Sequence, residues 1–224
     1  MYPVGPPVDT RPAPQPQRVT LHGTEVDLVP LDPVLHGPSL FDTTATSGHD
    51  HLWTYMFDGP FADRGTFERK LRELAAPDDP LYYAVIGRPS GLAVGRAALM
   101  RIDTANRVIE VGSIVYGSRL QRTRAATEAM YLLAQYVFDT LRYRRYEWKC
   151  NALNAPSRAA ALRLGFTFEG IFRQHMIVKG RNRDTAWYSM TDAEWPMRKA
   201  RLERWLAPAN FDDRGRQVRS LSAM

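Results

Sequence analysis

The segment from residue 81 to residue 117 constrains the fold most, because it reads as three consecutive strands. Its apolar runs are LYYAVIG, LAVGRAALMRID and VIEVGSIVYG, and the short turn sequences RPSG and DTANR separate them. Runs of this kind, bounded by glycine, proline and asparagine, are typical of antiparallel strands joined as hairpins. We therefore expect an antiparallel sheet in the middle of the chain.

A strongly periodic helix is predicted soon after the third strand. Ala126, Met130, Leu133, Val137 and Leu141 recur at the spacing of one helix face. The turn that leads into this helix, SRLQRTR, contains three arginines and no glycine. The segment therefore predicts a strand, a charged turn and a core helix in that order.

The other elements follow from similar patterns. Alternation in VTLHGTEVDLVPLD predicts two short strands or one bent strand, and TFERKLRELAA predicts a helix over 66–76. Further on, RRYEWKC predicts a strand, NAPSRAAALRLGF a helix, KGRNR the turn of a hairpin, and EWPMRKARLERWL a last helix. The stretch 33–65 is ambiguous. This order implies an α/β (α+β) fold, with one mixed and mostly antiparallel sheet that carries helices on its faces.

Length and composition favour one domain with tails. The chain has 224 residues, of which 44% are hydrophobic, enough to form a core. Six prolines among the first 16 residues disfavour both helix and sheet. We expect a proline-rich disordered tail over 1–18, one domain over 19–206 and a polar tail over 207–224.

Charge and cysteine content limit the partners and the compartment. The net charge of +6 favours anionic partners such as a phosphorylated cofactor, nucleic acid or acidic lipid. Cys150 is the single cysteine, so the chain can form no internal disulfide and no cysteine-rich metal site. Neither a signal peptide nor an uncharged apolar run long enough to cross a bilayer is evident. We expect a soluble, cytoplasmic protein with no membrane partner.

The charged turn before the periodic helix has two interpretations. A strand that turns into a helix N-terminus presents backbone amides to an anion, and such turns are usually rich in glycine. Here Arg119, Arg122 and Arg124 are present instead. The turn is therefore either a phosphate site of unusual composition or a group of solvated arginines ahead of a core helix.

A longer motif connects the chain to a known family. The pattern N-x-x-S-x-x-A-x-x-x-x-G-F-x-x-E-G is followed by RDTAWYSM and EWP. With the preceding order of strands and helices, it resembles the GNAT superfamily of acyl-coenzyme-A-dependent N-acyltransferases, and most of all the branch that includes ribosomal-protein N-terminal acetyltransferases. The resemblance covers residues 19–206. It implies a single GNAT-type domain with helices on both faces of the sheet, splayed fourth and fifth strands, acetyl-CoA as co-substrate and a homodimer.

The resemblance implies a cofactor site around the charged turn. The family's pyrophosphate loop, Q/R-x-x-G-x-G/A, matches Gln121, Arg122, Thr123, Arg124, Ala125 and Ala126, with arginine in place of the central glycine. Backbone amides at the helix start, and arginine side chains, can still bind phosphate. By resemblance, an amide near Ile114 or Val115 polarises the thioester carbonyl. Asn154 binds the pantetheine arm, unless it only caps a helix, and Ser157 lies near the sulfur, unless it only faces solvent.

The reaction also needs a proton acceptor and tolerates a weak proton donor. Many relatives carry a tyrosine four residues before the G-F pair, but here that position is Ala161, so Ser157 is the nearest candidate acid. Glu110 precedes Gln121 by eleven residues, the spacing of a catalytic glutamate in several relatives, and is our candidate base. The alternative is a half-exposed strand residue paired with a cation such as Arg107.

Other candidate residues lie outside these motifs. His175 and the pair His49 and His51 are further candidate bases, and His-Asp-His alone is a poor metal site, so we expect no metal. We expect Cys150 to be a small buried residue near the cofactor groove, since no partner that would activate it can be named. Trp53 and Tyr55, with Phe57 and His175, are expected to line a partly open substrate pocket.

Two classes of function fit these observations. The first is an N-acyltransferase that moves an acetyl group from acetyl-CoA to a primary amine, on a protein N-terminus or a small molecule, by direct attack in a ternary complex. In that class we expect no nucleic acid partner. The alternative is a non-catalytic acyl-CoA sensor, or a basic protein that binds RNA through Arg142, Arg144, Arg145 and the loop arginines.

Overall fold

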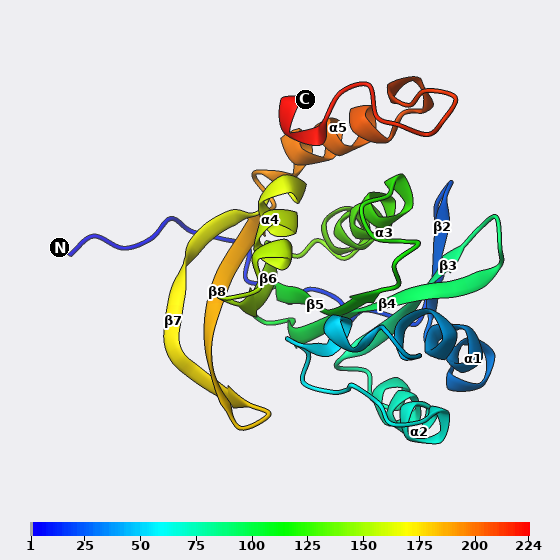
Figure 1. Ribbon diagram of the computed structural model, residues 1–224. Coiled ribbons are helices and arrows are strands. Elements are labelled where there is room, and N and C mark those ends of the chain that lie inside the picture. The colour runs from blue at the N-terminus through cyan, green and yellow to red at the C-terminus, as the bar shows by residue number, and fades with distance from the viewer. Residues whose placement is uncertain (1) are drawn as a thin grey trace.

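The computed structural model describes residues 2–224, which form one eight-stranded sheet with helices on both faces (Figure 1). The order across the sheet is β1-β2-β3-β4-β5-β6-β8-β7. The strands are β1 (Leu21–His22), β2 (Val26–Pro30), β3 (Leu81–Gly87), β4 (Leu92–Asp103), β5 (Val108–Tyr116), β6 (Arg145–Asn151), β7 (Thr167–Val178) and β8 (Arg181–Thr191).

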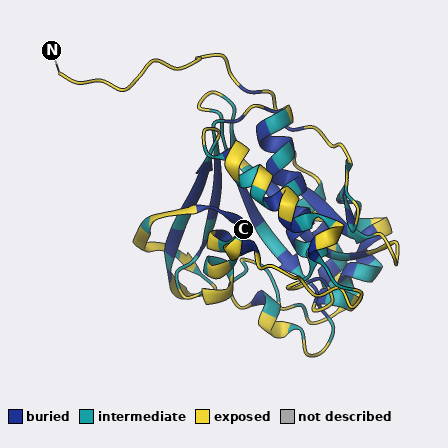
Figure 2. Ribbon diagram, turned by 90° about the horizontal axis from the view of Figure 1, so that it is seen from above, coloured by how far each residue is buried: buried dark blue, intermediate teal, exposed yellow. Residues whose placement is uncertain are grey.

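The helices divide between the two faces of the sheet. They are α1 (Pro33–Thr44), α2 (Arg64–Ala75), α3 (Arg124–Gln135), α4 (Ala155–Leu164) and α5 (Trp195–Leu206). One apolar core lies between the sheet and α3, α4 and α5, and a second lies under α1 and α2. Figure 2 shows the middle of the sheet buried between these layers. The expected fold class, a mixed sheet covered on both faces, is confirmed.

The sheet opens between β5 and β6. This is its one parallel pair, and its register joins Val108–Val111 to Arg145–Trp148 and ends there. Beyond that point β5 continues to Tyr116 and β6 to Asn151. These two strands are the fourth and fifth of the sequence prediction, because the bent strand over 21–30 counts as β1 and β2. The expected splay is therefore present.

Two β-bulges shape β4 and β5 near this opening. Arg96 pairs with Val115 and Ala98 with Gly112, so two residues of β5 lie opposite one residue of β4, and Ser113 adopts a φ of 50°. A bulge leaves its extra residue outside the ladder and increases the local twist. The bulge therefore lies in the half of β5 that faces the opening.

The second bulge is on β4 and has its own cap. Arg101 has a φ of 50°, and the Asp79 carboxylate accepts hydrogen bonds from the amides of Arg101 and Ile102, at 2.9 and 3.0 Å. These two amides would otherwise lack partners in the ladder. The cap fixes the direction in which the Arg101 side chain leaves the sheet.

Helix α3 forms as its apolar spacing predicts. The Thr123 side chain caps it by accepting from the amide of Ala126. Met130 and Leu133 are buried, and the same face continues through a π-helical turn over Tyr136–Thr140 to Leu141. The predicted positions of the other strands and helices agree with the structure to within a few residues.

Helix α1 lies in the stretch that gave no clear prediction. Asp32 accepts hydrogen bonds from the amides of Val34 and Leu35, and Pro33 occupies the first turn, where no amide is needed. Gly37 and Pro38 inside the helix hid the apolar pattern. The start signal, aspartate followed by proline, was present in the sequence.

The two ends of the chain contact the domain. The Ala13 amide donates to the Thr104 carbonyl at 2.9 Å, and the Tyr143 hydroxyl donates to the Pro14 carbonyl at 3.2 Å. Near the other end, Leu221 is fully buried in the core beside α4 and α5. The proposed domain limits at 18 and 206 stay a prediction. No helix within residues 2–224 is long and apolar enough to span a bilayer.

The buried carboxylate of Glu128 provides a test of how α3 is attached to the sheet. Glu128 on α3 accepts hydrogen bonds from the amides of Thr24, Glu25 and Val26 at 2.7 to 3.0 Å. Glu128→Gln turns an amide NH2 towards these donors, so we expect a loss of about 2 kcal/mol in the free energy of unfolding. Urea denaturation measures it. Glu73→Gln, at an exposed position, should change the value by less than about 0.5 kcal/mol. Equal values for both variants would contradict this role.

Candidate active site

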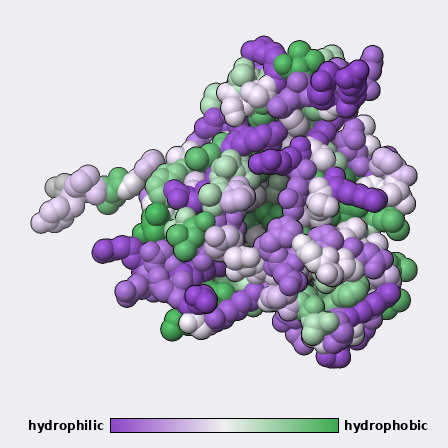
Figure 3. All heavy atoms as spheres, viewed as in Figure 1, coloured by the Kyte–Doolittle hydropathy of each residue, from purple (hydrophilic) through white to green (hydrophobic). Residues whose placement is uncertain are grey.

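The candidate active site lies where β5 and β6 separate. The opening brings together the end of β5, the N-terminus of α3, the end of β6 and the N-terminus of α4. The space-filling view shows a hollow with an apolar floor and a hydrophilic rim near the middle of this face, where α3, α4 and β5 meet in Figure 1 (Figure 3). The residues expected to bind a cofactor thus lie around one opening.

The start of α3 presents free backbone amides. The Thr123 hydroxyl is bonded to the Ala126 amide, but the amides of Arg124 and Ala125 have no acceptor within residues 2–224. The first amides of a helix carry a partial positive charge and attract anions. The Gln121 side chain donates to the Tyr116 carbonyl at 2.8 Å, and Arg122 is exposed with a φ of 62°. This turn has the donors that a phosphate group needs.

Arg124 points away from this turn. Its guanidinium forms an ion pair with Glu25 at 2.8 Å and donates twice to the Leu206 carbonyl at the end of α5. It also lies over the ring of Phe211, 4.8 Å from the centroid. In this structure the backbone amide of Arg124 can donate to an anion, while its side chain binds the end of helix α5.

The start of α4 contributes two polar residues to the opening. Asn154 caps the helix, since its side chain accepts from the Ser157 amide at 3.1 Å. The Ser157 hydroxyl accepts from the indole N–H of Trp148 at 3.0 Å and is partly exposed. Ala161 is fully buried, so the position where many relatives carry a tyrosine faces the core. Asn154 is a cap, which leaves its amide NH2 group for another partner.

Cys150 is buried beside Ser157. Its thiol is 6% exposed, and burial raises its pKa above 9.0, while a hydrogen bond from Ser157 and the charges of Arg183 and Arg158 oppose that rise. A thiol of this kind is mostly protonated near neutral pH and is a poor nucleophile. The expectation of a small buried residue near the groove agrees with this position.

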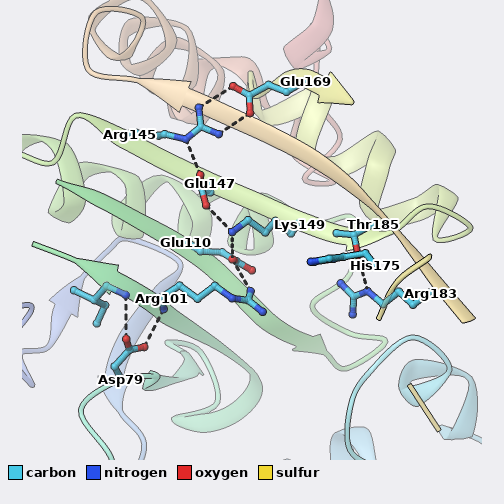
Figure 4. A network of polar contacts seen from close by, with 11 residues as sticks. Asp79, Arg101, Glu110, Arg145, Glu147, Lys149, Glu169, His175, Arg183 and Thr185 are labelled. Carbon is cyan, nitrogen blue, oxygen red and sulfur yellow. Dashed lines mark hydrogen bonds and ion pairs between the residues drawn. The ribbon is translucent and has the colours of Figure 1, made fainter. Parts of the chain in front are cut away.

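Glu110 is buried on the other face of β5, towards α1 and α2. Its Oε2 atom forms ion pairs with Arg101 at 2.7 Å and Lys149 at 3.0 Å (Figure 4). Its Oε1 atom accepts from no group within residues 2–224 and lies 3.3 Å from where a Cβ on Gly112 would be. The residue is 3% exposed rather than half exposed, and Arg107 pairs with Asp9 instead. One carboxylate oxygen is therefore neutralised and the other is free.

An alternating chain of charges continues from Glu110 across the sheet. Lys149 bonds Glu147 at 2.6 Å, Glu147 bonds Arg145 at 2.6 Å, and Arg145 forms a two-point contact with Glu169 (Figure 4). With Arg101 and Glu110 the chain holds three cations and three anions. Buried charges of this kind are tolerated because each one is paired. Arg145, which the RNA-binding alternative uses, is committed to this network.

A small cavity adjoins the bulge of β5. It has a volume of about 170 Å³ and lies between α2, the loop after α1 and the sheet. Met100, which lines the cavity, and Glu110 Oε1 both lie next to Gly112, where a Cβ would meet both of them. The cavity is lined by Phe57, Asp58, Lys70, Leu74, Tyr82, Met100 and Ser113. A small amine in this cavity would lie near the free oxygen of Glu110.

The aromatic stretch expected to line a substrate pocket is divided by the fold. Trp53 is 1% exposed, donates to the Thr44 carbonyl at 2.8 Å and packs against Phe61, so it is a core residue and not a pocket wall. The Tyr55 hydroxyl donates to the Leu153 carbonyl at 3.2 Å and connects this loop to the start of α4. Phe57, half exposed, is the aromatic residue of this stretch that reaches the cavity.

The histidines differ in position. His175 is exposed on β7, bonded to the Thr185 hydroxyl at 2.9 Å and placed beside Phe172 and Trp187. His49 and His51 make local contacts to Thr46 and the Gly48 carbonyl, away from the charge network. In the part of the chain that the structure describes, no three His, Cys, Asp or Glu side chains cluster as a metal site.

Sequence reasoning missed several residues of this face. Lys149 and Arg101 reach Glu110 from neighbouring strands, and Arg183 reaches the same region from β8 (Figure 4). Lys149 alternates with the buried Trp148 and Cys150, which was the one available sign that it shares a face with Glu147. The signal for Arg183 was absent, because a charged residue next to a hairpin turn is ordinarily exposed.

The fold and this opening define an acetyltransferase of the GNAT class. The family model described as "Acetyltransferase (GNAT) domain" matches residues 37–167, more than half of the chain, so the chain belongs to this family. A crystal structure of a GCN5-related N-acetyltransferase from Brucella melitensis has 52% identity and a TM-score of 0.93, over 95% of this chain and 96% of that one.

Two further relatives support the assignment. A Chromobacterium violaceum structure, described as a probable acetyltransferase of the GNAT family, has 40% identity and a TM-score of 0.79 over 88% of this chain and all of that one. The Bacillus subtilis (strain 168) protein named "Putative ribosomal N-acetyltransferase YdaF" is 30% identical over 141 residues, which are 60% of this chain and 76% of that protein. The first of these supports the family, and the name of the second supports the branch that the motif indicated.

The end of the charge network predicts a pH dependence of stability. Hydrogen bonds from Arg145 hold the pKa of Glu169 below its ordinary value of 4.5. A lowered folded-state pKa contributes stability above about pH 4.5 that is lost as the pH falls through the folded value. We expect wild type to lose more unfolding free energy than Glu169→Gln between about pH 6 and about pH 3. Parallel losses in urea titrations would show that the contact contributes nothing.

Proposed function

We propose that this protein moves the acetyl group of acetyl-CoA to a primary amine by direct attack in a ternary complex. The observation that carries the proposal is the opening between β5 and β6, with free helix amides at one side and a carboxylate with one free oxygen at the other. The amine nitrogen forms a bond to the acetyl carbon, the carbon–sulfur bond breaks, and coenzyme A departs as a thiolate. Membership of the acetyltransferase family supports this reaction class.

The N-terminus of α3 is proposed to bind the pyrophosphate. The amides of Arg124 and Ala125 have no acceptor among the described residues, and Ala126 is small enough for close approach. The exposed Arg122 can add a charge-assisted hydrogen bond. Gln121 and Thr123 hold the turn through their contacts with Tyr116 and the helix start. Pyrophosphate binding at this turn depends on backbone amides, so it does not require the glycine that arginine replaces.

The bulge in β5 is proposed to supply the donor for the thioester carbonyl. Ser113 and Ile114 lie opposite one residue of β4, so the ladder is interrupted just before Val115. An amide released from the ladder and fixed by the strand can stabilise the oxygen that gains negative charge. Asn154, through its free NH2 group, would hold the pantetheine arm on the other side of the opening.

Glu110 is proposed as the proton acceptor and Ser157 as the group near the sulfur. An ammonium must lose a proton before it attacks, and Oε1 of Glu110 lies next to Gly112 while Arg101 and Lys149 bind Oε2. The Ser157 hydroxyl accepts from Trp148 and can donate to a thiolate. A buried Cys150 with a raised pKa supports direct attack over an acyl-enzyme.

The acceptor is a primary amine on a protein N-terminus or a small molecule. The name of the Bacillus subtilis relative refers to ribosomal acetylation, which favours a protein N-terminus. The cavity of about 170 Å³ favours an acceptor of which only a few atoms enter. A screen of amines with detection of free thiol distinguishes these classes.

The role of Glu110 is tested by Glu110→Gln, which keeps the shape of the side chain. We expect turnover to fall by about a hundredfold or more with little change in acetyl-CoA affinity, because only the proton acceptor is lost. Thiol release across the pH range measures it. Glu147→Gln, a buried partner of the same Lys149, should cost less than about tenfold. Unchanged turnover at every pH would remove Glu110 from the mechanism.

The two arginines of the turn should behave differently. Arg122→Ala should weaken acetyl-CoA binding by about fivefold, since the exposed side chain is free to reach phosphate. Arg124→Ala should leave the Kd within about twofold but lower the free energy of unfolding by about 1 kcal/mol, since its contacts are to Glu25 and Leu206. Calorimetric titration and urea denaturation separate the two effects. Weaker binding by Arg124→Ala alone would assign the cofactor contact to Arg124.

A further inference from the structure

Arg183 is a buried guanidinium without a charged partner. It lies on β8, is 6% exposed, and forms no ion pair within residues 2–224. Its Nε atom donates weakly to the Thr185 hydroxyl at 3.3 Å, and its two Nη groups have no acceptor there while keeping accessible surface. Burial lowers the pKa of Arg183. A charge in this state costs free energy unless something outside the described chain compensates for it.

Most neighbouring side-chain charges are paired with an opposite charge. Arg101, Lys149 and Arg145 alternate with three glutamates, and Arg96 pairs with Asp58 at 2.7 Å. Lys179, from the hairpin turn, donates to the carbonyls of Trp53 and Asp58. Lys179 thus has carbonyl partners, whereas no carboxylate within residues 2–224 forms an ion pair with Arg183 and its Nη groups have no acceptor there.

Arg183 also lies beside the proposed site of transfer. Thr185 pairs with Asn151, the last residue of β6, so Arg183 lies just past the end of β6 at the mouth of the opening. Its guanidinium extends towards Glu110, whose negative charge favours the charged form of Arg183 (Figure 4). Phe57, which lines the cavity, covers it at 4.9 Å from the ring centroid. The guanidinium is thus held on the acceptor side of the sheet.

We propose that Arg183 binds a carboxylate of the acceptor, so that the substrate is a primary amine with a carboxylate a few bonds away. The proposal rests on the proposed function. An amino acid fits this description, and so does a peptide whose acidic side chain lies next to its N-terminus. With the amine near Glu110 and the carboxylate on Arg183, two opposite charges orient one small molecule. A planar guanidinium offers two parallel donors to such a group.

The test compares matched acceptors with acetyl-CoA. The small pair is β-alanine and β-alaninamide, and the peptide pair begins Ala-Asp and Ala-Asn. We expect wild type to prefer the carboxylate by about tenfold in kcat/KM, and Arg183→Met to lose that preference, because one charge-assisted contact is removed. A preference within the small pair indicates an amino acid as acceptor, and a preference within the peptide pair indicates a peptide with an acidic second residue. The two amines of a pair differ in basicity, but this difference cancels when the preference of Arg183→Met is compared with that of wild type, because both proteins are given the same amines.

Arg181→Met is the matched control. Arg181 lies two residues earlier on the same strand and face, is exposed, and carries the same charge. It should keep the preference of wild type. Equal effects of the two substitutions, or a wild-type preference for the amides, would overturn the proposal. A third result would also overturn it. If wild type prefers succinyl-CoA to acetyl-CoA with an acceptor that has no carboxylate, and Arg183→Met loses this preference, then Arg183 binds a carboxylate of the acyl donor.

Two readouts do not depend on turnover. N-acetyl-β-alanine should raise the melting temperature of wild type more than N-acetyl-β-alaninamide does, and Arg183→Met should abolish the difference. If no amine releases thiol, the proposed function fails while this binding result still decides the role of Arg183. The melting temperature of free Arg183→Met should equal or exceed that of wild type, because a buried unpaired charge is removed. A lower value than that of Arg181→Met would indicate a structural arginine.

Discussion

The short pairing between β5 and β6 is the constraint on which the rest of the structure depends. The two strands share a register from Val108 to Val111 and then separate, with the bulge at Ser113 directly beyond. Backbone groups in the separated halves cannot satisfy one another, so they are left to other partners. The N-termini of α3 and α4 lie at the same opening. One interrupted ladder thereby gathers amides, a serine and a carboxylate from β5, α3 and α4.

Charge pairing on the opposite face allows Glu110 to be buried beside this opening. Glu110 would be costly to bury alone, but Arg101 and Lys149 neutralise one of its oxygens and leave the other free. The network continues in strict alternation to Glu169, so it carries no net charge. Arg183 lies beside this network and has no counter-ion in the part of the chain that the structure describes. The free energy cost of burying its charge is the reason to look for an anionic ligand.

Much of the fold was predictable because it depends on local spacing. The three strands over 81–117 and the apolar face of α3 are patterns of period 2 and 3.6, and both formed as expected. Helix α1 was missed because Gly37 and Pro38 interrupt its pattern, although Asp32 and Pro33 gave a start signal. The candidate site was less predictable. Trp53 was expected at a pocket wall, yet flanking glycines and histidines do not determine which way an aromatic side chain turns, and it lies in the core.

The sequence by itself determined the order and type of most elements, with α1 as the exception. It also determined the strand-to-helix turn at Gln121 and the motif that begins at Asn154, because these depend on neighbours within a few residues. Only the tertiary structure decided what each charge meets. It turned Arg124 towards Glu25 and gave Glu110 two cations from adjacent strands. It left Arg183 without an anionic partner among the described residues. These outcomes depend on strand register and bulges, and a shift of one residue would move every side chain of a strand to the other face of the sheet.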